Sequence, residues 1–337
     1  MPQPADNPTS PGVNRRRFLK LGVAATAGGA LGTGAGLWLN RGGSSRAAVT
    51  ILKAPSYQQE LAALIRAGLN NYPAVIERAR GRRVLLKPNL VEYSNARRVN
   101  THPAVVAAAI EAFRAAGARE VVVAEGPGHQ RDTEMLLEES GLDDALRHER
   151  TPFVDLNLDS IRPVALAANY TKLGKLWLPD TALGADLIVS LPKLKTHHWT
   201  GVTLSLKNLM GVVPGAKYGW PKNLLHWRGI HQSIADIALA LRPGFAIVDG
   251  IEGMEGDGPL MGETVPAGVL IMGDNLAAVD ATATRVMGLR PERVAYLQLM
   301  ALHSGVIVEE AIAQRGERIA AVRRPFKVLE PFAGLRS

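Results

Sequence analysis

The sequence predicts an α/β protein with a mainly parallel sheet covered by helices on both faces. Short runs of consecutive apolar residues recur along the chain, as expected of strands that are buried on both faces. Stretches with the apolar spacing of amphipathic helices separate these runs. The 337 residues are 47% hydrophobic and 21% charged, a composition that excludes global disorder and allows a sizeable core.

The predicted elements alternate from residue 83 onward. A buried strand at 83–87 ends at Pro88, and a helix over 104–116 begins after Thr101 as its N-cap, with His102 and Pro103 at its start. Gly117 ends that helix. The further elements expected are strands at 120–124, 153–156, 185–191, 245–249 and 267–272, and helices at about 132–147, 230–241 and 277–287.

Residues 193–230 have weak periodicity, which predicts a long insertion or an active-site surface. No internal repeat is found. We therefore expect residues 47–337 to form a single α/β domain.

The first 46 residues match an export signal. Residues 14–20 read NRRRFLK, the twin-arginine pattern, and residues 21–39 are uncharged and rich in Gly and Ala. Small residues around Arg46 suit cleavage. We expect the twin-arginine translocase as a partner during export and a periplasmic or extracytoplasmic location. An uncleaved signal would instead tether the chain to the membrane.

Composition excludes several classes of protein. The chain has no cysteine, which rules out disulfides, thiolate zinc sites and an iron–sulfur cluster held by cysteine. The net charge is +8, but residues 1–46 contain six basic residues and one acidic residue, so the rest is close to neutral. This distribution predicts no nucleic-acid partner.

Basic and amide side chains follow the predicted strands. Because the carboxyl ends of strands in an open α/β sheet form the usual binding edge, these residues predict a site for a small anionic ligand. The expected ligand-binding residues are Lys87, Asn89, Lys193 and Asn208, and the expected catalytic residues are Lys195, His197 and Lys207. Lys193 and Lys195 are alternate residues of an extended segment, so they should point the same way.

A cluster of acidic residues follows the strand at 245–249. Asp249 and Glu252 are oxygen donors suited to Mg²⁺ or Ca²⁺, with His197 as acid/base or as a third ligand. The interleaved glycines are equally typical of a flexible surface loop. His197 and His198 are adjacent, so in an extended chain at most one of them faces the site. His226 and His231 are further candidates for metal binding or proton transfer.

Ser205 and Lys207 share one side of a strand-like stretch over 203–209. Such a pair suits nucleophilic catalysis, but a polar strand face explains it more simply.

Several motifs resemble the family called domain of unknown function 362. They include KPN at 87–89, THP at 101–103, PKLKTH at 192–197, LSLKNLMG at 204–211 and DGIEGMEGDGP at 249–259. IADI at 234–237 and AVDA at 278–281 complete the pattern, which spans roughly residues 50–290. Many members carry ferredoxin-like cysteine motifs, which this chain lacks. The resemblance implies a location for the site and no particular reaction.

Three functions remain open at this point. The leading hypothesis is an exported enzyme with a strand-end site for an anionic ligand, with or without a divalent metal. The alternative is an exported solute- or metal-binding protein without catalysis. A third is an interaction protein held at the membrane surface, with an apolar patch near Trp199, Trp220 and Trp227.

Overall fold

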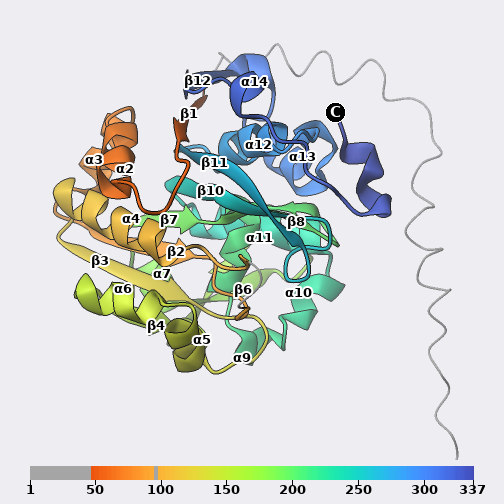
Figure 1. The fold of residues 1–337 in the computed structure, drawn as a ribbon. Coiled ribbons are helices and arrows are strands. Elements are labelled where there is room, and N and C mark those ends of the chain that lie inside the picture. The colour runs from red at the N-terminus through yellow and green to blue at the C-terminus, as the bar shows by residue number, and fades with distance from the viewer. Residues whose placement is uncertain (1–46, 95–97) are drawn as a thin grey trace, which may run out of the picture. The chain divides into compact units, whose positions relative to one another are not determined.

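A ten-stranded mixed sheet organises the computed structural model, which describes residues 47–94 and 98–337 (Figure 1). Eight strands follow one another in the order β12-β1-β11-β10-β7-β2-β3-β4, and β8 pairs with β10 and β9. The strands are β1 (Ala47–Lys53), β2 (Arg83–Pro88), β3 (Glu120–Glu125), β4 (Phe153–Asp155), β7 (Leu187–Leu191), β8 (Lys193–His197), β9 (Gly201–Thr203), β10 (Phe245–Glu255), β11 (Glu263–Gly273) and β12 (Ile312–Gly316). A separate hairpin joins β5 (Ile161–Ala165) and β6 (Lys175–Pro179).

The central strands run parallel. The pairs β10–β7, β7–β2, β2–β3 and β3–β4 are parallel, whereas β11 is antiparallel to both β10 and β1. The prediction of a mainly parallel sheet is confirmed. Its consequence is that the carboxyl ends of β2, β3, β7 and β10 lie at one edge of the sheet.

Helices cover both faces of the sheet (Figure 1). Val84 and Leu86 of β2 enter one core and Leu85 enters the other, the alternation of a strand buried on both sides. The first core contains α2 (Leu61–Leu69), α3 (Pro73–Ala79), α4 (Pro103–Ala115), α5 (Thr133–Glu139) and α6 (Leu142–His148). The second contains α11 (Ile230–Leu241), α12 (Leu276–Val286) and α13 (Ala295–Ala301), with α7 (Asp180–Leu183) and α14 (Ile319–Val322) beside it.

The start of α4 differs from the prediction. His102, not Thr101, caps the helix, because His102 Nδ1 accepts a hydrogen bond from the Ala104 amide at 3.1 Å. The Thr101 hydroxyl instead accepts from the Asn89 amide at 2.9 Å and donates to the Leu191 carbonyl at 2.6 Å. Thr101 therefore ties the end of β2 to the end of β7.

The single helix predicted over 132–147 is wrong. The chain forms α5 and α6, separated at Gly141, whose φ of 71° lies in the left-handed region. A helix cannot continue through a residue in that conformation, and glycine adopts it without the steric penalty of a side chain.

The segment at 193–230 is folded against the sheet edge. It contains β8 and β9, then the short helices α8 (Ser205–Asn208), η1 (Leu209–Val212), α9 (Gly215–Tyr218) and α10 (Asn223–Trp227). Because α8 is helical, Ser205 and Lys207 do not share a strand face. The acidic stretch from Asp249 is likewise no flexible loop, since β10 continues to Glu255 past an irregularity between Gly250 and Glu252.

Within residues 47–94 and 98–337, no helix combines the length and apolar character needed to cross a bilayer. The predicted twin-arginine signal, residues 1–46, lies outside the described residues.

Candidate functional site

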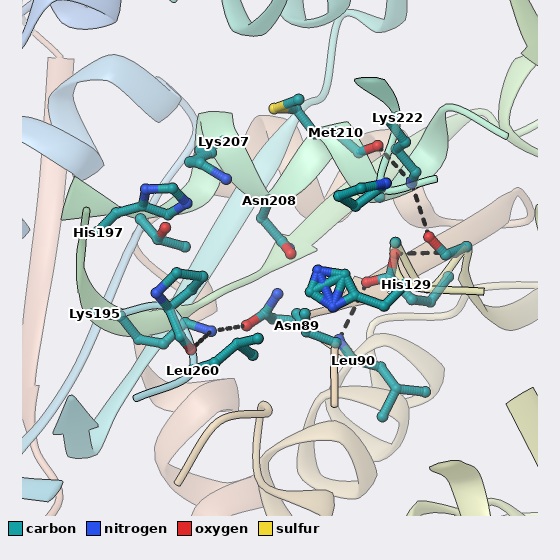
Figure 2. A pocket seen from close by; sticks show the side chains of 18 of the residues that line it. Asn89, Leu90, His129, Lys195, His197, Lys207, Asn208, Met210, Lys222 and Leu260 are labelled. Carbon is teal, nitrogen blue, oxygen red and sulfur yellow. Dashed lines mark hydrogen bonds between the residues drawn. The ribbon is translucent and has the colours of Figure 1, made fainter. Parts of the chain in front are cut away.

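A cavity of about 360 Å³ lies at the carboxyl ends of β2, β3 and β8 (Figure 2). The segment at 193–230, predicted to be an insertion or an active-site surface, contributes more than half of its lining. Four lysines and four histidines line it, namely Lys87, Lys195, Lys207 and Lys222 with His129, His197, His198 and His226. Figure 2 shows Lys195, Lys207 and His197 on one side of the cavity and Lys222 and His129 on the other.

Lys87 at the floor of this cavity is fully paired. Its Nζ donates to the Glu125 carboxylate, to Asn208 Oδ1 at 2.9 Å and to the Pro88 carbonyl at 2.8 Å. Asn208 Nδ2 in turn donates to the Lys87 carbonyl and to Ser190 Oγ. Lys87 and Asn208, both predicted to bind ligand, therefore use their polar groups on each other and on the sheet.

Gly211 explains how this floor packs so closely. A Cβ at Gly211 would overlap both the Glu125 carboxylate and the Lys87 ammonium. Only glycine lets the backbone of η1 lie directly against the ion pair.

Lys195 is buried without a carboxylate partner in the described part of the chain. Its Nζ donates to Asn89 Oδ1 at 2.6 Å and to the Val99 carbonyl at 2.9 Å, both neutral oxygens. Burial, and then the charge of Lys207, hold the pKa of Lys195 well below its usual value. Asn89, which also lines the cavity, thus positions Lys195.

Lys222 has the same kind of environment on the other side. Its Nζ donates to the carbonyls of Gly126 and Met210, each at 2.8 Å. Burial lowers its pKa to about 7. The residue has a φ of 68°, so the backbone is held in a conformation that lysine rarely adopts.

Lys207 differs from the other three lysines of the cavity. Its Nζ makes no hydrogen bond or ion pair with any residue that the structure describes. Burial and the nearby Lys87 charge lower its pKa to about 8. Its charge in turn lowers the pKa of His197 and of His226.

The backbone around Lys207 is fixed by a buried carboxylate. Asp280 of α12 accepts hydrogen bonds from the Ser205 amide at 2.8 Å, the Leu206 amide at 3.1 Å and the Ser205 hydroxyl at 2.5 Å. Burial raises the pKa of Asp280 to about 7. Ser205 therefore anchors α8 instead of acting as a nucleophile beside Lys207.

Two cavity histidines are held in opposite tautomers by their partners. His197 Nδ1 accepts from the Trp199 amide at 2.9 Å, which places the proton on Nε2. His226 Nδ1 lies 3.1 Å from the Lys222 carbonyl, an acceptor, which places the proton on Nδ1 and leaves Nε2 with a free lone pair. Burial and Lys207 hold the pKa of His197 well below its usual value and lower that of His226 to about 4, so both rings are neutral.

The expectation that only one of His197 and His198 reaches the site is wrong. Both line the cavity, and their ring centroids lie 4.8 Å apart. The alternation of an extended chain does not apply, because β8 ends at His197 and the chain turns at His198.

Lys193, predicted to bind ligand, does not line the cavity. Its Nζ pairs with Asp249 Oδ2 at 2.9 Å and donates to the Tyr57 hydroxyl at 2.6 Å. Asp249 also accepts from the His102 amide, and Glu252 pairs with Arg98 at 2.6 Å.

The structure gives no support for a metal site at Asp249 and Glu252, because each carboxylate already binds a cation. In the described ranges, no three His, Asp or Glu side chains come together in a way that could hold a metal ion.

Lys222 and His129 were not among the predicted site residues. His129 follows β3 in the strand-end series, so its position was a usable signal. Lys222 follows no strand and depends on the turn after Pro221, which the sequence pattern does not reveal.

Comparisons with known proteins place the chain in a family. The family model described as "Domain of unknown function (DUF362)" matches residues 84–285. A thylakoid-associated protein of Synechocystis sp., sll1697, is 29% identical over 262 residues, which cover 73% of this chain and 76% of that protein.

Two solved structures are similar at low levels. The lactate racemase apoprotein of Thermoanaerobacterium thermosaccharolyticum gives a TM-score of 0.42 at 15% identity. The match covers 60% of this chain and 50% of the racemase chain. A Thermotoga maritima protein gives 0.40 at 15% identity, over 74% of this chain and 60% of that one. On the match across residues 84–285, the chain belongs to the DUF362 family of domains of unknown function.

Proposed function

We propose that this protein is an enzyme that binds a small anionic molecule in the cavity and transfers a proton to or from it. The observation that carries the proposal is the meeting of Lys195, Lys207 and Lys222 at one cavity without a carboxylate among the described residues to pair with them. The proposal keeps the predicted catalytic role of His197 and the candidate role of His226 in proton transfer. It gives Lys195 and Lys207, predicted as catalytic, an anion-binding role instead and adds Lys222 to them.

The need for an anion follows from the cost of burying charge. A buried ammonium is unfavourable unless it is paired, and the lowered pKa values of the three lysines express that cost. Among the residues that the structure describes, none accepts a hydrogen bond from Lys207 Nζ, and Lys222 Nζ has one donor left after its two carbonyls. A phosphate or carboxylate group would supply both the missing charge and the missing acceptors.

The two histidines supply the acid and the base. His197 presents an Nε2–H donor and His226 presents an Nε2 lone pair, so one ring can give a proton while the other takes one. Burial, and then the Lys207 charge, lower both histidine pKa values. A bound anion offsets the lysine charge and therefore raises both histidine pKa values, which favours proton transfer near neutral pH.

The binding part is tested by isothermal titration calorimetry with orthophosphate, sulfate and acetate. We expect binding to the wild type and loss of about tenfold or more in affinity in Lys207→Met, since a charged hydrogen bond is removed. Lys217→Met is the matched control, because Lys217 belongs to the same segment but is exposed and does not line the cavity. Equal affinity in Lys207→Met and wild type would contradict the site.

The catalytic part needs a separate readout. The protein is incubated in D₂O with an anionic small-molecule extract of host cells, and mass spectrometry follows conversion or deuterium uptake. We expect changes that disappear in His197→Gln and His226→Gln while phosphate still binds. A wild type that binds anions but alters no component of the extract would favour the non-catalytic binding protein and overturn the enzyme.

We infer the place of action from the first residues of the sequence. The arginines at 15 and 16 support export by the twin-arginine route to the extracytoplasmic side. Changing both to lysine is expected to leave the precursor in the cytoplasmic fraction, and unchanged fractionation would contradict export by this route.

A further inference from the structure

Part of the cavity is apolar and plays no role in binding an anion. Besides the lysines and histidines, its wall includes the apolar side chains of Leu90, Val91, Met210, Pro259 and Leu260. Figure 2 shows Leu90, Leu260 and Met210 around the ring of polar side chains. A ligand that consisted only of a small anion would leave this wall in contact with water, which is unfavourable for apolar surface.

Trp199 extends the apolar wall to the mouth of the cavity. Its side chain is 52% exposed, and among the large apolar residues exposed in the described chain it alone lines this cavity. It stands on the turn after β8, and its amide donates to His197 Nδ1 at 2.9 Å. The residue is therefore fixed beside the histidine that carries the Nε2 proton.

The indole ring also touches the other histidines of the site. Its centroid lies 4.9 Å from that of His226 at an interplanar angle of 68°, and 4.8 Å from that of His198 at 80°. These edge-to-face contacts are a favourable geometry for aromatic rings. They hold a flat apolar surface next to the groups that we propose to move the proton.

We propose that the bound molecule carries a planar apolar ring that packs against Trp199, with its anionic group on Lys195, Lys207 and Lys222. This inference rests on the proposed anion site and narrows its substrate class to aryl phosphates or aryl carboxylates. A planar ring can stack on the exposed indole and cover it, whereas an extended hydrocarbon chain covers it less well.

The test compares ligands of equal charge that differ in the apolar part. Titration calorimetry measures phenyl phosphate, hexyl phosphate and methyl phosphate against the wild type. We expect phenyl phosphate to bind about tenfold more tightly than methyl phosphate, with hexyl phosphate between them. Equal affinity for phenyl and methyl phosphate would overturn the inference, and hexyl phosphate binding as tightly as phenyl phosphate would overturn the ring requirement.

Variants assign the preference to Trp199. Trp199→Ala is expected to lose the phenyl preference while binding methyl phosphate as the wild type does, and Trp199→Phe is expected to keep the preference. Trp227→Ala is the matched control, since Trp227 is next to His226 and 79% exposed but does not line the cavity. Loss of the preference in both alanine variants, or in neither, would contradict the role of Trp199.

The outcomes separate this inference from the proposal beneath it. Failure of all three phosphates to bind would contradict the anion site itself. Binding of all three with no preference would leave the anion site standing and remove only the aromatic group.

Discussion

Lys193 and Lys195 lie two residues apart on β8, and both side chains are 0% exposed, yet their surroundings differ. Lys193 meets a buried carboxylate, Asp249, and a tyrosine hydroxyl. Among the described residues Lys195 meets only neutral oxygens, those of Asn89, Val99 and, at 3.4 Å, Pro259, and it lines the cavity. Lys87 and Lys207 differ in the same way, since Lys87 pairs with Glu125 and Lys207 has no protein partner among the described residues.

This contrast distinguishes lysines that stabilise the fold through a buried ion pair from lysines that are available to bind an anionic ligand. The charge of a buried lysine that pairs with a carboxylate is already neutralised within the protein. Replacing that lysine leaves the carboxylate buried without a partner. A lysine without a carboxylate partner, such as the buried Lys195 or the partly buried Lys207, can be paired by an anionic ligand instead. The two kinds of lysine should therefore differ in stability, in pH-dependent anion binding and in their effect on a neighbouring histidine.

The largest effect is expected on stability. Lys193→Met should lower the free energy of unfolding by about 3–5 kcal/mol, because Asp249 is then buried without its cation. Lys207→Met should lower it by less than about 1 kcal/mol or raise it, since no described group loses a partner. Urea unfolding followed by circular dichroism measures both variants. Equal losses of stability in the two variants would contradict the distinction between the paired Lys193 and the unpaired Lys207.

The second effect is on the pH dependence of anion binding. Sulfate keeps a fixed charge over the range, so changes in its affinity report the protein. Lys222 and Lys207 lose their protons as pH rises through their pKa values of about 7 and about 8. Sulfate affinity should therefore fall by about tenfold or more between pH 6.5 and pH 8.5. Lys207→Met should show a shallower fall, and a flat profile in the wild type would oppose the account.

The smallest effect is on a neighbouring histidine. Burial is the main cause of the lowered pKa of His226, about 4, and the Lys207 charge is the second cause. Removing that charge in Lys207→Met should raise the pKa of His226, and Lys217→Met should leave it unchanged. An NMR titration of the histidine ring protons measures the value, with His226→Gln to assign the resonance. A pKa for His226 that does not move would show that Lys207 lies too far away to act on it.

Much of the fold could be predicted, because its signals are local. The apolar strands and the helix at 230–241 follow from hydrophobic periodicity, and the structure places α11 at the predicted residues. The prediction of one helix over 132–147 was wrong because Gly141, in a left-handed conformation, divides the segment into two helices despite its continuous periodicity. The predicted strand at 245–249 was too short, because pairing with β11 extends β10 to Glu255. That pairing is a long-range contact, which the local sequence pattern does not contain.

The site was only partly predictable. Reading past the strand ends found Lys87, Asn89, Lys195 and His197, because chain topology alone brings those positions together. Which lysine meets a carboxylate depends on the partner strand, so Lys193 and Lys195 look alike in the sequence. Lys222 depends on a turn within the segment at 193–230, where periodicity is weak.

Anomalous diffraction from crystals soaked in selenate shows whether the unpaired lysines of the cavity bind an anion. Selenate is a dianion of the right charge, and its position can be located without reference to any activity. The account predicts a selenate in the cavity with an oxygen about 2.7–3.2 Å from Lys207 Nζ and within reach of Lys195 or Lys222. Selenate bound at other surfaces with an empty cavity would contradict the claim that the unpaired lysines form an anion site.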